Sequence, residues 1–334
     1  MKKILTLLFL TTAVLSVMAQ GGHAPMKFSG KATVSVPSMS VTVPVESDTV
    51  VYSGSDITLP KMVYGQMVIP SFTIHNATFT MDMSTMTVTF PDQTFSETIT
   101  VDGEEKVITG TSLLGSYAHD AFNTFTLTAT FQYGKMPFPM TYNITAYYIK
   151  DYTDKLDVSI GGAFNYTAAN VTYSVRTYPE NNNTLLDVSV PSYQLSGTPL
   201  GELTIGSYIV KGLAADNEKG GYYRDYANDG LTMHFKAVKD GQTTMDADYA
   251  MSEGENNILL VYEGKKIKVT NAFHPGAMPK QIVSTFPGVG EASALDAVKT
   301  IEQHDAPAYN LAGQRTAAEY KGIVVKNGKK YFQR

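Results

Sequence analysis

Apolar and polar residues alternate along most of the chain, which is typical of β-strands with one buried and one exposed face. Thr, Val, Tyr and Phe dominate the alternating runs, and Gly, Asn, Asp and Pro lie between them. Many short strands separated by turn residues predict an all-β barrel or sandwich, with a short helix expected only at 291–303. The alternating segments are 32–36, 41–45, 86–90, 125–131, 140–148, 156–160, 171–175, 186–190, 203–210, 231–238 and 258–262.

The first residues have the pattern of a secretory signal peptide. Lys2 and Lys3 precede an apolar run at 4–15, and Val17-Met18-Ala19 is a small-x-small cleavage site. The apolar run is shorter than the roughly 20 residues of a membrane-spanning helix, which disfavours an uncleaved anchor. We therefore expect residues 1–19 to be removed and the mature chain to be exported without a transmembrane helix.

An internal repeat divides the body of the chain. Residues 56–74 align without gaps on 187–205. Four positions are identical and five more are conservative, and the β-rich segments around the two copies have equal length. We expect two copies of one β domain, 27–150 and 155–275, joined at 151–154. The identical pairs are Asp56/Asp187, Pro60/Pro191, Thr73/Thr204 and Ile74/Ile205.

Each copy resembles the calycin-like domain of secreted proteins from Gram-negative anaerobes. The opening strand FSGKATV at 28–34 and the two repeated segments carry this resemblance; in the second copy the opening, within 164–175, lacks the Gly. The resemblance implies two tandem lipocalin-like antiparallel β-barrels. Barrels of about eight strands either hold one small ligand or fill with side chains. The Gly-x-Trp signature of lipocalins is missing because the chain has no Trp.

The last residues form a separate unit. Residues 309–334, with Tyr309, Gly313, Gly322 and Gly328, are similar to a shortened type IX secretion sorting motif. The resemblance implies a β tail, 306–334, of three short strands that export machinery recognises; the alternative is a small β appendage kept in the mature protein. Residues 276–305, rich in Pro, Gly and Ala, are expected to be a linker.

Charge and cysteine content exclude several classes of protein. The 334-residue chain has 26 basic and 31 acidic residues, and six of the basic residues lie in the 306–334 tail. The remaining body is acidic, which argues against nucleic acid and anionic membrane surfaces as partners. The absence of Cys excludes disulfides, thiolate metal sites, Cys nucleophiles and a lipoprotein anchor.

No motif for catalysis is present. The six His lie outside HExxH and other two-His ligand spacings, and the chain has neither a Gly-x-Ser-x-Gly elbow nor a P-loop. His75 follows the repeated Thr-Ile, but Gly206 holds its place in the second copy, so a surface or core role is favoured over a ligand role. We expect no enzyme activity, no catalytic residue, no metal and no cofactor.

Five groupings of side chains have both a structural and a functional interpretation or could be mistaken for a site. Met81, Met83 and Met86 suit Cu(I), although filling of the barrel is the favoured explanation. Asp102, Glu104 and Glu105 are expected in a solvated hairpin, and Asp225 with Asp229 in a solvated loop or a weak Ca²⁺ site. Asp48-Thr49-Val50 resembles an O-glycosylation acceptor of such bacteria. The tyrosines that could form a carbohydrate or partner platform are Tyr147, Tyr148, Tyr152, Tyr222, Tyr223 and Tyr226.

Three functions are compatible with this pattern. The working prediction is a non-enzymatic binding protein, exported to the periplasm, the outer-membrane surface or the medium, that holds a small apolar or amphipathic ligand inside a barrel. The alternatives are a cell-surface interaction protein with filled barrels and an outer-membrane barrel. A site reproduced by duplication would lie in 56–74 and 187–205. An empty apolar interior favours ligand binding, and an interior packed with Phe, Met and Tyr favours the surface role.

Overall fold

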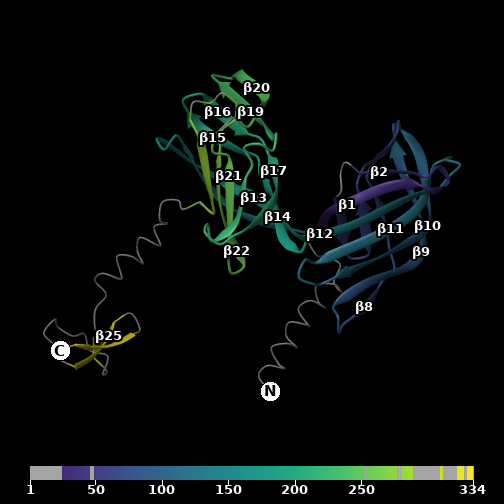
Figure 1. Ribbon diagram of the computed structural model, residues 1–334, viewed down its shortest axis with the longest axis horizontal. Helices are drawn as coiled ribbons and strands as arrows, with labels where there is room; N and C mark the ends of the chain where they lie inside the picture. The colour runs from purple at the N-terminus through teal and green to yellow at the C-terminus, as the bar shows by residue number, and fades with distance from the viewer. Residues whose placement is uncertain are drawn as a thin grey trace.

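The computed structural model describes residues 25–45, 49–252, 254–276, 278, 280–288, 309–310, 322–326 and 329–333. Within these ranges the secondary structure is β-strand apart from one 3-10 turn, η1 (Pro37–Met39). The prediction of an all-β fold is therefore confirmed. The expected signal peptide and the expected helix at 291–303 lie outside the described residues. Two β bodies follow one another along the chain (Figure 1).

The first unit, called here the N-terminal body, comprises residues 26–149. Its strands pair antiparallel in the order β7–β4–β3–β1–β12–β11–β10–β9–β8, and β2 also pairs with β1. The strands are β1 (Met26–Val36), β2 (Val41–Pro44), β3 (Val50–Ser53), β4 (Asp56–Leu59), β7 (Phe72–Ile74), β8 (Thr80–Asp82), β9 (Thr87–Val101), β10 (Glu104–Ala118), β11 (Thr124–Tyr133) and the first half of β12 (Met140–Ile160).

Side chains join the two ends of this ladder. Asn76 has a left-handed φ of 56°, which interrupts the extended chain between β7 and β8. Opposite this break, Glu97 Oε1 accepts the His75 N–H at 2.7 Å. Gln93 accepts the Thr78 N–H at 2.8 Å and donates to the Thr78 carbonyl at 2.9 Å. One carboxylate and one amide side chain of β9 thus form the hydrogen bonds that backbone groups of a neighbouring strand would form in a regular ladder.

The second unit, called here the closed barrel, is an eight-stranded antiparallel barrel. Each strand pairs with the next, and the last strand, β23, returns to pair with β12, so the ladder closes. Closure removes the exposed edges of a sheet. The strands are the second half of β12, β13 (Phe164–Glu180), β14 (Asn183–Val190), β17 (Tyr208–Asp216), β18 (Gly221–Asp225), β21 (Asn257–Glu263), β22 (Lys266–Phe273) and β23 (Ile282–Phe286).

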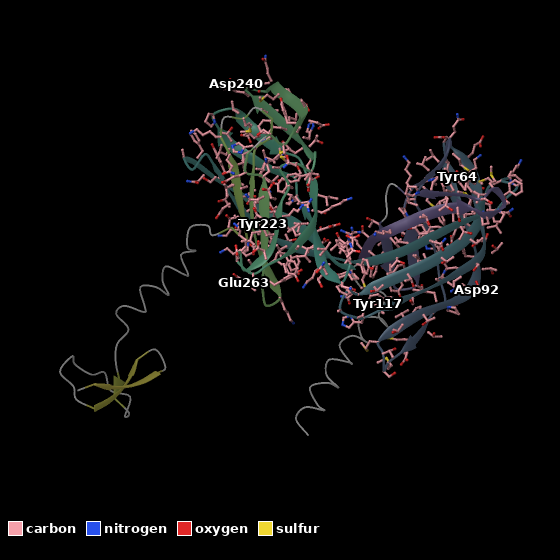
Figure 2. All side chains as sticks on the ribbon, in the orientation of Figure 1. Tyr64, Asp92, Tyr117, Tyr223, Asp240 and Glu263 are labelled. Carbon is pink, nitrogen blue, oxygen red and sulfur yellow. The ribbon has the colours of Figure 1, made fainter. Side chains whose placement is uncertain are left out.

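A separate four-stranded sheet, called here the cap sheet, is inserted into the closed barrel. It consists of β15 (Tyr193–Thr198), β16 (Gly201–Ile205), β19 (Thr232–Lys239) and β20 (Gln242–Ala250). Its buried side chains, such as Leu203 and Phe235, belong to the same apolar core as the barrel. Figure 1 shows the cap sheet at one end of the barrel. Figure 2 shows Asp240, in the β19–β20 turn of the cap sheet, and Glu263, the last residue of β21, at opposite ends.

Strand β12 belongs to both bodies. It runs without interruption from Met140 to Ile160 and pairs with β1 through its first half and with β13 and β23 through its second. The segment 151–154, which we expected to be the joint between domains, is therefore inside a strand. The barrel also extends beyond the expected boundary at 275, because β23 lies within the expected linker 276–305. The short alternating run at 282–286 carries this strand.

The two repeated segments begin alike and then diverge. In both, a strand (β4 or β14) ends just before the repeated proline, Pro60 or Pro191, which has no N–H to donate to a ladder. A hairpin follows in both, β5 (Met62–Tyr64) with β6 (Met67–Ile69) or β15 with β16. Beyond it, β7 returns to pair with β4, whereas β16 joins the cap sheet and β17 pairs with β14. The duplication of the domain stays a prediction.

The described parts of the tail confirm its expected three strands. β24 (Tyr309–Asn310), β25 (Gly322–Lys326) and β26 (Lys329–Gln333) form an antiparallel sheet. No helix in the part of the chain that the structure describes is long and apolar enough to cross a membrane.

Candidate functional site

A row of side chains crosses the boundary between the two bodies. Lys27 of β1 and Arg176 of β13 lie opposite Ile149 on the two sides of β12. Arg176 is in turn opposite Asp187 of β14. Directly opposed residues of neighbouring strands project from the same face of a sheet. These side chains therefore share the outer face of a surface that is continuous from β1 to β14.

Arg176 and Asp187 form a buried ion pair at the centre of this row. The Arg176 Nη2 donates to Asp187 Oδ2, and Nη1 donates to the hydroxyl of Ser29 at 2.9 Å. Only 17% of the Arg176 side chain and 7% of the Asp187 side chain are exposed. The guanidinium also lies 5.0 Å from the centre of the Tyr178 ring. Burial, and then the nearby Asp187 carboxylate, raise the pKa of Tyr178 to about 12.

A β-bulge lies beside the ion pair. Leu186 pairs with Leu213 and Val188 with Val210, so Asp187 alone faces two residues of β17, Lys211 and Gly212. Asp187 Oδ1 accepts the Gly212 N–H at 2.9 Å. Gly212 has a φ of +71°, a conformation that glycine adopts without strain. Bulges bend a strand and redirect the neighbouring side chain, here that of Lys211.

These residues surround a cavity of about 240 Å³, called here the saddle cleft. One wall of the cleft comes from the N-terminal body and the rest from the closed barrel. Two ion pairs join β1 to β12 and β13 nearby: Lys27 with Asp151 at 3.1 Å and Lys31 with Glu180 at 3.2 Å. Interfaces between domains are common places for small-molecule sites. The lining residues are Ser29, Thr49, Ile149, Ser174, Arg176, Asp187, Ser189, Ile209 and Lys211.

The interior of the closed barrel is occupied by aromatic side chains. Tyr173 and Phe286 lie 4.9 Å apart between ring centres, and Tyr208 lies 6.0 Å from Phe273. All four are buried. The interior of the N-terminal body is similar, with Phe28 stacked on Phe125 at 4.8 Å and further buried Phe, Tyr and Met around them.

A polar network runs through the aromatic interior of the closed barrel. The Tyr226 hydroxyl donates to Asn271 Oδ1 at 2.7 Å, and Asn271 Nδ2 donates to the Tyr208 hydroxyl at 2.7 Å. Burial raises the pKa of Tyr208 to about 12 and that of Tyr226 further above its ordinary value. The buried hydroxyl of Tyr193, from the cap sheet, has no hydrogen-bond partner among the described residues. Buried polar groups usually have partners, so this hydroxyl needs an explanation.

The repeated segments 56–74 and 187–205 place their apolar residues in the two cores. Ile57, Leu59, Val188 and Val190 are all buried. His75 lies in the loop after β7, where Nδ1 is 3.0 Å from Asp56 Oδ2 and the imidazole is half-exposed. A structural role for His75 accounts for these contacts. Thr49, within the glycosylation-like tripeptide, is half-buried in the wall of the saddle cleft.

The methionine and acidic groupings do not assemble into sites. Met81 packs against the core of the N-terminal body, whereas Met83 is exposed. Asp102 lies in the turn of the β9–β10 hairpin, as expected. Asp229 pairs with Arg224 through two nitrogens of the guanidinium. Within the described ranges, no group of three or more His, Asp or Glu is placed to hold a metal ion.

The candidate tyrosines are spread over different surroundings. Tyr226 is fully buried in the barrel. Tyr222 contacts Tyr262 edge to face at 6.1 Å, and Lys219 lies over Tyr223 at 5.1 Å. Tyr147, in the half of β12 that pairs with β1, stacks on Tyr178 of β13 at 6.2 Å between ring centres. The structure thus gives these residues packing contacts and does not bring all six together.

Sequence reasoning did not find the saddle cleft. Arg176 and Lys211 lie in ordinary alternating strands, and Ser29 lies in the opening strand 28–34, where the glycine next to it is the recognisable feature. One feature of the sequence points to this cleft, because Asp187 is one of the four residues that are identical in the two repeated segments. A carboxylate kept in both copies, at the first residue of β4 and inside β14, indicates a role that apolar packing does not explain.

Comparison with known proteins supports the fold of the second body. Residues 150–289 match the calycin-like beta-barrel domain family, and this range coincides with the closed barrel. No curated protein matches the chain. Among solved structures, the chain resembles the crystal structure of a putative outer membrane protein from Bacteroides fragilis, with 14% identity and a TM-score of 0.26. The match covers 78% of this chain and 94% of that one.

Proposed function

We propose that this protein is an exported, non-enzymatic protein of the cell envelope, in which filled barrels serve as scaffolds and outer surfaces make the contacts with other molecules. One observation carries the proposal. The interior of the closed barrel, where a lipocalin-like protein would hold its ligand, is packed with buried Tyr and Phe side chains such as Tyr173, Tyr226 and Phe273. By the criterion set out above, such an interior favours the surface role over ligand storage.

Two further features agree with this proposal. The interior of the N-terminal body is packed in the same manner, with Phe28, Phe90, Phe125 and Phe131 fully or almost fully buried. The export part rests on sequence, namely the basic and apolar residues at 2–15 and the sorting-like tail at 309–334. In this proposal the tail is recognised by export machinery, and the N-terminal body is a second copy of the barrel.

An apolar fluorescent dye tests the filled interior. We expect the mature protein to give no rise in the fluorescence of anilinonaphthalene sulfonate. Phe273→Ala removes a buried ring and should create a space that admits the dye. Phe164→Ala removes an exposed ring of the same barrel and should behave like the unchanged protein. The proposal is wrong if the unchanged protein already enhances the dye as strongly as Phe273→Ala.

Mass spectrometry of the protein from its native host provides a second test. We expect the intact masses under native and denaturing conditions to agree, because no ligand is carried inside. An additional mass that is lost on denaturation would reveal a bound molecule and overturn the filled-barrel proposal. The denatured mass also reports whether residues 306–334 remain, and their removal would support recognition of the tail by a sorting machine.

A small polar ligand inside the closed barrel is the second candidate function. It is favoured by the buried Tyr193 hydroxyl, which lacks a partner among the described residues, close to the network of Tyr208, Tyr226 and Asn271. A buried water would satisfy the same hydroxyl. Native mass spectrometry separates the two, because a ligand adds a mass larger than that of water.

A further inference from the structure

Among the described residues, the saddle cleft combines one positive charge that has no ion-pair partner with several residues that carry hydroxyl groups. The charged residues among the described lining are Arg176, Asp187 and Lys211. The Arg176–Asp187 ion pair is internally balanced, and the remaining Asp187 oxygen accepts the Gly212 N–H. Lys211 is exposed and has no ion-pair partner among the described residues. The charge that the cleft offers to an incoming molecule is therefore that of the Lys211 ammonium.

The backbone fixes the point at which the Lys211 side chain leaves strand β17. Lys211 belongs to the β17 bulge opposite Asp187, and the Asp187–Gly212 hydrogen bond holds the bulge in place. Ile209, two residues before Lys211 on the same strand, lies opposite Ser189 and lines the same cleft. A bulge beside a cavity is a recurring way to direct a side chain into a site.

Residues that carry hydroxyl groups line the same space from both bodies. Ser189 comes from the closed barrel and Thr49 from the N-terminal body. Hydroxyls donate and accept hydrogen bonds, so they suit either an oxyanion or an alcohol of a ligand. Ile149 and Ile209 supply an apolar wall. A volume of about 240 Å³ is smaller than the roughly 300–1,000 Å³ of sites for drug-sized molecules, so the ligand must be small.

We propose that the saddle cleft binds a small hydroxyl-bearing oxyanion of the size of one sugar, in which the Lys211 ammonium contacts a carboxylate or phosphate and the Ser189 and Thr49 hydroxyls contact its alcohol groups. This proposal rests on the proposed function, in which the outer surfaces of the two bodies, where the cleft lies, make the contacts with other molecules. The Arg176–Asp187 pair is a positioning element, because it holds the bulge that carries Lys211.

Titration calorimetry on the mature full-length chain tests this site with three probes of similar size: glucuronate, glucose 6-phosphate and glucose. We expect the first two to bind and the neutral sugar to bind at least tenfold more weakly. The affinity for the anions should fall as NaCl is raised, because salt screens an exposed charge. Equal binding of glucose, or no binding of any probe, would overturn the proposal.

Two lysine variants locate the binding. Lys211→Met removes the ammonium and keeps an unbranched apolar side chain, and it should weaken binding of the charged probes about tenfold. Lys268→Met is the matched control, because Lys268 is also an exposed lysine on a strand of the closed barrel and does not line the cleft. An equal loss in both variants would show non-specific attraction and contradict the assignment. Failure here leaves the dye test of the filled barrels unchanged, so the two proposals fail separately.

Discussion

Asp56 and Asp187 occupy the same position in the two repeated segments and make the same two kinds of contact, one with a backbone N–H and one with a side-chain nitrogen. Each carboxylate accepts a backbone N–H from beyond its own strand, Asn76 N–H at 3.1 Å and Gly212 N–H at 2.9 Å. Each also contacts a nitrogen-bearing side chain, His75 or Arg176. The surroundings differ, because 41% of the Asp56 side chain is exposed and only 7% of the Asp187 side chain.

This difference in burial predicts unequal effects of the same substitution. Asp187→Asn leaves the buried Arg176 charge without its carboxylate and should lower the free energy of unfolding by about 3 kcal/mol. Asp56→Asn removes a solvent-exposed contact and should cost about 1 kcal/mol or less. Urea unfolding of both variants, followed by circular dichroism, measures the difference. Equal losses would show that the Arg176–Asp187 pair contributes no more than a surface contact.

Removal of the buried hydroxyl should lower the stability of the protein at Tyr226 but not at Tyr193. Tyr226→Phe removes the donor to Asn271 and leaves a buried amide oxygen poorly satisfied, which should cost about 1–3 kcal/mol. Tyr193→Phe removes a hydroxyl that has no partner among the described residues, so stability should stay the same or rise. The unfolding midpoints in urea test this. A loss in Tyr193→Phe as large as that in Tyr226→Phe would mean that the Tyr193 hydroxyl is satisfied by a bound molecule or water.

Gly30 is placed where β1 and β12 approach closely. A Cβ added there would lie 2.0 Å from the Thr145 carbonyl oxygen, and backbone atoms cannot give way without loss of pairing. Gly30→Ala should therefore cost at least about 2 kcal/mol and speed amide exchange along β1. The control is Gly54→Ala, where φ is +63° and no atom lies within 4 Å, so only the conformational cost of about 1 kcal/mol remains. A harmless Gly30→Ala would contradict the β1–β12 register.

His234 should titrate above its ordinary range. Its Nδ1 lies 2.8 Å from an Asp248 oxygen and its Nε2 2.9 Å from an Asp246 oxygen, and the hydrogen bond to Asp248 is the main cause of a raised pKa. The fold favours the protonated imidazole, so this contribution to stability is present below about pH 6.5 and is lost as the pH rises through the raised pKa.

NMR titration of the His234 ring signals measures this pKa directly. We expect Asp248→Asn to lower the pKa of His234 more than Asp246→Asn does, because Asp248 makes the larger contribution. A pKa at or below 6.5 in the unchanged protein would show that the two carboxylates are too well solvated to hold the proton.

The strands of the fold could be predicted where one face is buried and the other exposed. The run at 125–131 alternates apolar and polar residues, and β11 shows the same alternation of buried and half-exposed side chains. Strand β20 could not be found in this way, because almost all of its side chains are exposed on both faces and its sequence carries no period. β23 was missed because five residues between two prolines carry too little pattern to be distinguished from a linker.

The saddle cleft could not be predicted from local sequence patterns, because it forms through strand pairing between distant parts of the chain. Ser29 and Arg176 are 147 residues apart in the chain and meet only because β1 and β13 lie on the two sides of β12. Alternation shows that their side chains point away from the barrel interiors, and it predicts solvent exposure for both. Ser29 is buried, and only 17% of the Arg176 side chain is exposed, because the outer faces of two bodies meet there.

The shared strand β12 sets an order in which the protein can acquire its structure. Its first half closes against β1, and its second half closes against β23, in each case across more than 100 residues of chain. When the chain is released with its amino-terminal end first, the N-terminal body can be completed as soon as the first half of β12 has been released. The same strand is then already extended and held along one side before β13 to β23 have appeared. The first body thus offers an extended strand on which the non-local pairing of the second can begin.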